Sequence, residues 1–296
     1  MGPGHPECPQ RLDAIDDHLL ATGLDIALLR RDAPLARDVD LEHAHSKGYL
    51  IELNELLDAV SDSGESRAID PDTLVCPGTR QAMLRAAGAA VAATDEVIDG
   101  KVINAFCAVR PPGHHATRDQ AGGFCFINNV AVAARHALDV RGLDRVAIID
   151  FDVHHGNGTE DIVAGDDRIL MCSFFQDQLY PFSGSVPKGD NMCNLAVPAY
   201  TRGMALRELI DANWIPRLHA FRPQMIFISA GFDAHREDEM GQLGLVEADY
   251  EWITRQLVAV AEQHCKGRIV SCLEGGYSLS ALARSVAAHV RVLAGV

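Results

Sequence analysis

Five apolar runs of strand length constrain the fold of this 296-residue chain most strongly, because nearly all of its loops rich in glycine or proline follow such a run. Continuous apolar strands that alternate with helices are typical of a parallel sheet covered on both faces. The sequence therefore predicts one α/β domain over residues 1–296, with an open, mainly parallel sheet. We expect strands at 102–109, 146–151, 169–174, 225–229 and 269–273, and helices at 79–98, 129–138, 205–218, 246–261 and 279–293.

Charge and cysteine content narrow the function. The 26 Lys and Arg against 41 Asp and Glu give a formal charge of −15, so the chain lacks the basic field that direct nucleic-acid binding needs. The eight cysteines are scattered without a C-x-x-C pair, which predicts reduced thiols. The first residues resemble no secretion signal, and no apolar run reaches the ~18 residues of a membrane span. We therefore expect a cytoplasmic protein without membrane contact.

Polar loops that follow parallel strands meet at one edge of the sheet, where ligand sites form. In the segment AIIDFDVHHGNGT, Asp150, Asp152 and His154 recur with a period of two, which puts them on one face if the strand continues that far. Asp233 directly follows the strand MIFISAG. One imidazole and two carboxylates leave an open position on Zn²⁺ for water, so we predict a zinc site. The alternative is a set of buried or capping polar groups.

Two further motifs carry candidate catalytic groups. His114 and His115, in PPGHHA, also follow a strand, and a neutral imidazole there could move a proton to a leaving amine. The alternative is that one of the two histidines is structural. Tyr277 follows two glycines in LEGGYS, and its phenol could donate a hydrogen bond to an oxyanion. The alternative is an ordinary turn residue.

Six segments together resemble, in order, the motifs of the classical zinc-dependent histone deacetylase superfamily, which includes acetylpolyamine amidohydrolases and acetoin-utilisation proteins. The resemblance runs from about Gly4 to the last helix, and the HHGNG form is that of class II members, so the chain is similar to a bacterial class II-like member. The segments are GHPECPQRL, RPPGHHA, GGFCFINNVAVAA, IIDFDVHHGNGT, SAGFDAH and LEGGY.

The resemblance implies roles for the site residues. His115 would be the general base and acid, with His114 as its electrostatic neighbour. Asp150 would pair with His114, and Asn157 with His115. Since Asn157 stands where many eukaryotic nuclear members carry Asp, it can orient His115 without stabilising imidazolium by a full charge, so we expect a lower His115 pKa than in an Asp-paired site. One Zn²⁺ ion per chain would be held by Asp152, His154 and Asp233.

The resemblance also implies a mechanism and a second ion. Zinc-activated water would attack an amide carbonyl polarised by Zn²⁺ and by Tyr277, and His115 would protonate the departing amine. A monovalent cation, usually K⁺, is expected in a structural or modulatory role. Its ligands would be Asp150, Ser173 and the backbone oxygens of Asp152, His154 and Phe174.

Substrate choice is expected to depend on a narrow tunnel for an extended lysine stem. Met240 stands where polyamine-selective relatives carry an acidic gatekeeper, which favours acyl-lysine in a peptide or protein as the substrate. Glu237, Asp238 and Glu239 lie just before Met240 and leave an acetylpolyamine as the alternative. Acyl length, physiological substrate and oligomeric state stay open. Candidate substrate-binding residues are Phe124 and Tyr180 in the walls, Gly123 and Gly275 lining them, and Asp72 at the rim.

Two alternative functions of a different class fit the sequence less well. An arginase-type binuclear manganese hydrolase needs a carboxylate two residues after the D-x-H histidine, where this chain has Gly156. A non-catalytic acyl-lysine binding module would be expected to lose a zinc ligand or Tyr277, and neither is lost. Relatives usually carry a short apolar strand before the GHPE motif. We expect either that the sheet lacks this strand or that the natural chain starts earlier, and that the site is intact in both cases.

Overall fold

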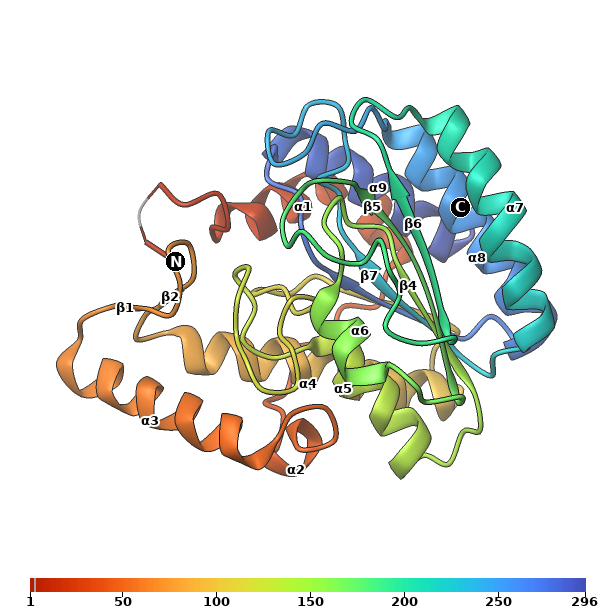
Figure 1. Ribbon diagram of the computed structural model, residues 1–296. Coiled ribbons are helices and arrows are strands. Elements are labelled where there is room, and N and C mark those ends of the chain that lie inside the picture. The colour runs from red at the N-terminus through yellow and green to blue at the C-terminus, as the bar shows by residue number, and fades with distance from the viewer. Residues whose placement is uncertain (3) are drawn as a thin grey trace.

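A six-stranded parallel sheet forms the centre of the computed structural model, which describes residues 1–2 and 4–296 (Figure 1). The strand order is β3-β8-β7-β4-β5-β6, and every neighbouring pair in this sheet runs parallel. The predicted open parallel sheet with helices on both faces is therefore confirmed. The strands are β3 (Asn104–Cys107), β4 (Val146–Asp150), β5 (Ile169–Gln176), β6 (Met192–Val197), β7 (Ile226–Ala230) and β8 (Ile269–Leu273).

Two apolar cores lie on opposite faces of this sheet. Along β4, Val146 and Ile148 face one core while Ala147 and Ile149 face the other, as the period of two in a strand requires. The first core contains side chains of α3 (Lys47–Ser63), α4 (Thr79–Ile98) and α5 (Asn129–Arg135). The second contains side chains of α1 (Gln10–Ala21), α7 (Gly203–Phe221), α8 (Glu247–Cys265) and α9 (Leu279–Ala294).

Short elements complete the described chain. The 3₁₀-helix η1 (Leu24–Ala27) and the one-turn helix α2 (Asp38–Leu41) follow α1, and α6 (Asn157–Val163) follows β4. The hairpin of β1 (Arg67–Ala68) and β2 (Leu74–Val75) stands apart from the main sheet.

Side-chain caps mark several helix ends. The Ser46 hydroxyl accepts from the Tyr49 N–H at 3.3 Å at the start of α3, and the Asn128 side chain accepts from the Ala131 N–H at 3.0 Å at the start of α5. Gly64 closes α3 in the left-handed conformation.

Some elements differ from the predicted ones. The segment predicted as a helix over 129–138 changes at His136 into a π-helix, η2 (His136–Val140). β6 was not predicted, because Asn194 interrupts its apolar run; the Asn194 amide donates to Glu160 Oε1 at 2.8 Å. α1 and α3 were not predicted either. The described residues ahead of α1 form no strand, and β3 is an edge strand.

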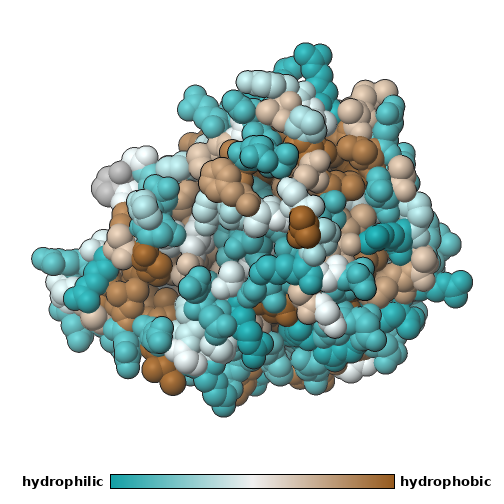
Figure 2. Space-filling model, viewed as in Figure 1, coloured by the Kyte–Doolittle hydropathy of each residue, from teal (hydrophilic) through white to brown (hydrophobic). Residues whose placement is uncertain are grey.

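The outer surface is mostly polar. Figure 2 shows hydrophilic residues over most of one face and hydrophobic residues gathered over the α3 side. Among the described helices, none is both long enough and apolar enough to cross a membrane.

Gly88 lies in the middle of α4, and the structure predicts that replacing it by alanine destabilises the protein, whereas helix propensity predicts the opposite. Propensity alone predicts that Gly88→Ala stabilises α4 by about 0.5–1 kcal/mol. In the structure, a Cβ at residue 88 would lie 2.1 Å from the Pro34 carbonyl oxygen and 2.7 Å from the Ala36 nitrogen. We therefore expect Gly88→Ala to lower the free energy of unfolding by about 1–3 kcal/mol in urea titration.

Gly48→Ala in α3 is the matched control, because the nearest atom to its Cβ would be Ser46 Oγ at 4.0 Å. This variant should unfold at an unchanged or slightly higher urea concentration. A higher midpoint for Gly88→Ala would contradict the close backbone contact.

Candidate active site

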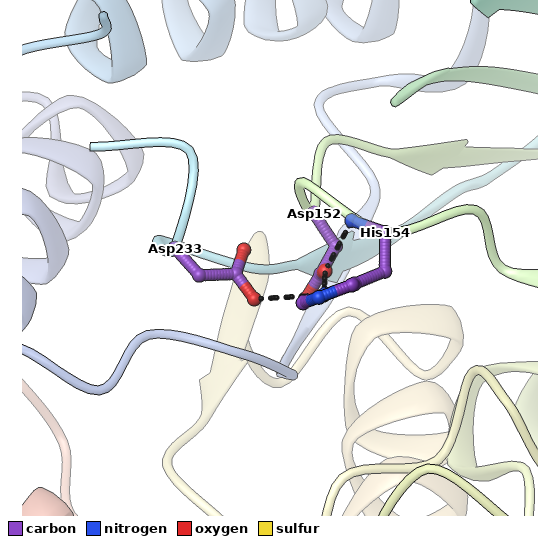
Figure 3. A group of neighbouring side chains, drawn as sticks. All are labelled: Asp152, His154 and Asp233. Atoms are coloured by element: carbon purple, nitrogen blue, oxygen red, sulfur yellow. Dashed lines mark hydrogen bonds and ion pairs between the residues drawn. The ribbon is translucent and has the colours of Figure 1, made fainter. Parts of the chain in front are cut away.

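The predicted metal ligands meet at the carboxyl ends of two neighbouring strands. Asp152 and His154 follow β4, Asp233 follows β7, and these strands pair directly. Figure 3 shows the three side chains pointing toward one another. His154 Nδ1 lies 3.0 Å from Asp152 Oδ1 and 3.2 Å from Asp233 Oδ2. All three residues are buried, and one ligand atom from each lies within 4.8 Å of the others.

The donor set fits a metal ion. Within the described chain, Asp233 Oδ2 is buried without a hydrogen-bond donor, although it faces His154 Nδ1. The remaining carboxylate oxygens are oriented by backbone groups, since the Val153 N–H donates to Asp233 Oδ1 at 2.9 Å and the Gly275 N–H to Asp152 Oδ2 at 2.8 Å. One nitrogen and two carboxylate oxygens at this spacing are suitable ligands for Zn²⁺.

Electrostatics also favour a cation at this cluster. Burial raises the pKa of Asp233 to about 7, and the neighbouring Asp152 charge adds to the increase. Burial alone would lower the pKa of His154, but the neighbouring carboxylates of Asp152 and Asp233 outweigh it and raise that pKa to about 10. A bound dication would replace protons on these groups, so metal binding is expected to release protons.

Glycines make room for these carboxylates. A Cβ at residue 275 would lie 2.0 Å from Asp233 Oδ2 and 2.6 Å from Asp152 Oδ2. A Cβ at residue 231 would lie 2.1 Å from Asp152 Oδ2. Close approach of the backbone therefore requires glycine at both positions.

The two histidines each contact the predicted partner. His114 Nδ1 lies 3.0 Å from Asp150 Oδ2, and the His115 ring nitrogen Nδ1 lies 2.7 Å from Asn157 Oδ1. Burial disfavours the charged form of His114, but the carboxylates of Asp152 and Asp150 keep its pKa well above the ordinary value. Burial together with the charges of His114 and His154 keeps the pKa of His115 well below it. The two neighbouring rings thus have opposite protonation preferences.

Aromatic side chains surround His115. The Tyr180 ring packs edge-on against His115 with centroids 4.9 Å apart, and Phe124 packs edge-on against Tyr277 at 5.9 Å. Phe124 adopts a positive φ of 70°. At Gly123, a Cβ would lie 2.4 Å from the His115 ring. The predicted wall residues Phe124 and Tyr180 therefore lie beside the predicted catalytic residues.

Arg11 supports the Tyr277 loop and was missed at the sequence level. It is fully buried, and its guanidinium lies 4.9 Å from the centroid of the Tyr277 ring. Arg11 Nε donates to the Gly276 carbonyl at 2.7 Å, and Nη2 donates to the Glu274 carbonyl at 2.5 Å. Glu7 pairs with Arg11 at 3.4 Å and receives two hydrogen bonds from Arg110. Glu7 and Arg11 both lie in the segment GHPECPQRL, which was the available signal.

Burial and the nearby charge of Arg11 act on the Tyr277 phenol. Burial raises its pKa well above the ordinary value, against the opposing charge of Arg11. The hydroxyl therefore stays protonated and able to donate at neutral pH.

Glu274 is a second buried group that was not predicted from the sequence. Its Oε2 accepts from the Gly113 N–H at 2.6 Å and from the His114 N–H at 3.1 Å, and Oε1 accepts from the Ser229 hydroxyl at 3.1 Å. Burial raises the pKa of Glu274 to about 7. The loop after β8 thereby contacts the loop that carries the histidine pair.

The predicted rim residue Asp72 has its backbone carbonyl 3.1 Å from Nε2 of His5, whose ring packs edge-on against Phe124. Asp72 is exposed, whereas Asp70 is half-buried and accepts from the N–H groups of Asp72 at 2.9 Å and Thr73 at 2.6 Å. A Cβ at Gly122 would lie 3.5 Å from Asp70 Oδ2 and 3.5 Å from the Tyr180 hydroxyl. Asp70 Oδ2 and the Tyr180 hydroxyl thus both lie beside Gly122.

The remaining predicted residues lie on the elements expected of them. Ser173 pairs with Asp150 in the register of β4 and β5, and its hydroxyl donates to Asn194 Oδ1 at 3.2 Å. Phe174 stacks on Trp214, so its ring belongs to the core. Met240 is half-buried on the loop after β7, and its N–H donates to Asp238.

Gly156 speaks against a binuclear arginase-type site. A Cβ at residue 156 would lie 2.2 Å from Asp150 Oδ2. A carboxylate side chain at this position would collide with Asp150, so the extra ligand that a second metal requires has no room.

Comparison with known proteins agrees with the resemblance noted from the motifs. The Histone deacetylase domain matches residues 5–293. Type-2 histone deacetylase 2 of Dictyostelium discoideum is 41% identical over 245 residues, which are 75% of this chain but 14% of that protein. Histone deacetylase-like amidohydrolase of Pseudomonas aeruginosa is 38% identical over 282 residues, 93% of this chain and 73% of that protein.

A solved structure gives the same result for the fold. The crystal structure of the HDA15 HD domain superposes with a TM-score of 0.90 at 32% identity and covers 100% of this chain and 84% of its own. Since the domain match spans nearly the whole sequence and the fold agrees throughout, this chain belongs to the histone deacetylase family.

Proposed function

We propose that this protein is a zinc-dependent amidohydrolase that removes acetyl or other acyl groups from the ε-amine of lysine in peptides or proteins. The observation that carries the proposal is the convergence of Asp152, His154 and Asp233 on one buried point, where Asp233 Oδ2 faces His154 Nδ1 at 3.2 Å. These three residues would hold the zinc ion. When bound, zinc supplies a Lewis acid that polarises the amide carbonyl and acidifies water.

His115 is proposed to move the protons of the reaction. Because its pKa is held low, its ring is neutral at pH 7 and can accept a proton at Nε2. Asn157 Oδ1 accepts from the opposite nitrogen, which fixes the ring orientation and the tautomer. After acceptance, the same nitrogen can deliver the proton to the departing amine.

Tyr277 is proposed to stabilise the oxyanion. Its phenol is kept protonated, so it donates a hydrogen bond to the oxygen on which negative charge develops. Arg11 stacks on the ring and holds two carbonyl groups of the same loop, which limits the movement of the phenol.

Acyl-lysine is favoured over an acetylpolyamine as the substrate. A second ammonium would need a carboxylate at the gatekeeper position, where the chain has Met240. The acidic residues just before it are partly committed to other contacts. Glu237 pairs with Arg284 at 2.8 Å, and Asp238 is buried and accepts backbone N–H groups. Phe124 and Tyr180 are proposed to flank the aliphatic stem.

Three other assignments belong to the same proposal. A monovalent cation would lie beside Asp150, Ser173 and the Phe174 backbone, whose strands are neighbours. All eight cysteines are free thiols, which supports a reducing compartment such as the cytoplasm. The rim carboxylate is proposed to be Asp70 or Asp72.

A hydrolysis panel tests the proposed activity. The purified chain is offered an acetyl-lysine peptide, longer acyl-lysine peptides and acetylputrescine, with and without a chelator. We expect hydrolysis of an acyl-lysine peptide, loss of activity with the chelator, and recovery when Zn²⁺ is added back. If no acyl-lysine peptide is hydrolysed, the proposed function is wrong. A strong preference for acetylputrescine would contradict the proposal that Met240 disfavours polyamine substrates.

The pH dependence of kcat/KM tests the role of Asn157. The neutral form of His115 is the active base, so activity should fall on the acid side only below the ordinary histidine pKa. Asn157→Asp places a negative charge beside His115, which favours imidazolium and raises its pKa. The acid limb of the profile should therefore move to higher pH. An unmoved limb, at unchanged zinc content and melting temperature, would mean that His115 is not the titrating base.

Met240→Glu tests the specificity proposal. A carboxylate at this position would attract the free ammonium of acetylputrescine, and an interaction of about 1.4 kcal/mol changes a ratio of specificity constants about tenfold. We expect the ratio of kcat/KM for acetylputrescine to that for an acetyl-lysine peptide to rise about tenfold. Met240→Gln, of similar size but uncharged, should leave this ratio nearly unchanged. Equal ratios for both variants would show that residue 240 does not face the substrate.

A further inference from the structure

Asp238 links two loops of the site through three backbone hydrogen bonds. It lies on the loop between β7 and α8 and is 6% exposed. Its Oδ2 accepts from the Tyr277 N–H at 2.6 Å and from the Ser278 N–H at 2.9 Å. Its Oδ1 accepts from the Met240 N–H at 3.0 Å. The Asp238 carboxylate therefore holds the backbone of Tyr277 and Ser278, just before α9, and the backbone of Met240 at the gatekeeper position.

The Tyr277 loop depends on such contacts because its own sequence gives it little rigidity. Gly275 and Gly276 precede the tyrosine, and Gly276 has a φ of +119°, a conformation that only glycine adopts easily. Arg11 restrains the carbonyl side of this loop at Gly276. Asp238 restrains the N–H side at Tyr277 itself. Both polar groups of the peptide bond between Gly276 and Tyr277 are thus held by side chains from other parts of the chain.

We infer that Asp238 is a positioning residue for the reaction, which acts through the Tyr277 backbone and sets the loop of Met240 relative to it. The inference rests on the proposed function. Hydrogen-bond donation to an oxyanion is effective only over a narrow range of distance, and a misplacement of about 1 Å can reduce a rate about 100-fold. A carboxylate suits this position since it can accept from three N–H groups, whereas an amide presents one accepting oxygen.

A helix-capping role is the competing explanation. Ser278 precedes α9, so Asp238 also caps this helix from outside it. A cap alone would affect the stability of the protein and leave the turnover of folded molecules unchanged. The test must therefore separate stability from turnover.

Asp249 offers a matched control. It is also 6% exposed, it accepts from the Val246 N–H at 2.9 Å at the start of α8, and it pairs with Arg207. It contacts none of the residues proposed for catalysis or substrate binding. Asp249→Asn should lower the melting temperature and leave kcat and KM per zinc-loaded molecule unchanged.

The experiment compares Asp238→Asn with this control in the full chain, using an acetyl-lysine peptide. We expect kcat per zinc-loaded molecule to fall about 10- to 100-fold with KM within about threefold of the parent. If the Asn variant does not fold, Asp238→Ser, which keeps one accepting oxygen, is measured in its place. Unchanged kcat at a lowered melting temperature, as for Asp249→Asn, would reduce Asp238 to a helix cap and overturn the inference.

A double-mutant cycle with Tyr277→Phe tests whether Asp238 acts through the phenol. If it does, Asp238→Asn should reduce kcat much less in the Tyr277→Phe background than in the parent. Fully additive losses would overturn the inference while leaving the proposed function intact. A parent chain that hydrolyses no acyl-lysine peptide would instead overturn the proposed function and, with it, this inference.

Discussion

Burial of four carboxylates at one edge of an apolar sheet is the constraint on which the rest of this structure depends. A buried charge is costly unless hydrogen bonds or opposite charges surround it. The partners come from neighbouring loops: His114 approaches Asp150, and the Gly275 N–H donates to Asp152. Supplying these partners brings the loops after β3, β4, β7 and β8 into contact and so assembles the site. The four fully buried residues are Asp150, Asp152, Asp233 and Glu274.

Much of this arrangement could be predicted from local sequence. Apolar runs indicated the positions of five of the six strands of the main sheet, because strands buried on both faces show no polar alternation. The period of two from Asp150 to His154, and Asp233 directly after a strand, were enough to predict a metal site. The motifs indicated the pairing of His115 with Asn157, and in the structure His115 Nδ1 lies 2.7 Å from Asn157 Oδ1. β6 was not predicted because the half-buried Asn194 interrupts its apolar run.

The supporting residues could not be predicted in the same way. Arg11, Glu274 and Asp238 lie in recognisable motifs, but their partners are backbone groups of distant loops. Backbone donors and acceptors are the same at every residue, so sequence gives no sign of which carbonyl a guanidinium will contact. Gly88 illustrates the same limit for packing, because the segment that touches it lies about fifty residues earlier in the chain. Such contacts depend on the final topology.

The hydrogen bonds of Arg11 join two parts of the chain that are synthesised at very different times. Arg11 belongs to the first helix, and its acceptors lie 263 and 265 residues later. During synthesis from the N-terminus, its guanidinium remains without these acceptors until Glu274 and Gly276 have left the ribosome. All six strands of the main sheet are therefore synthesised before Arg11 can meet the loop of Tyr277.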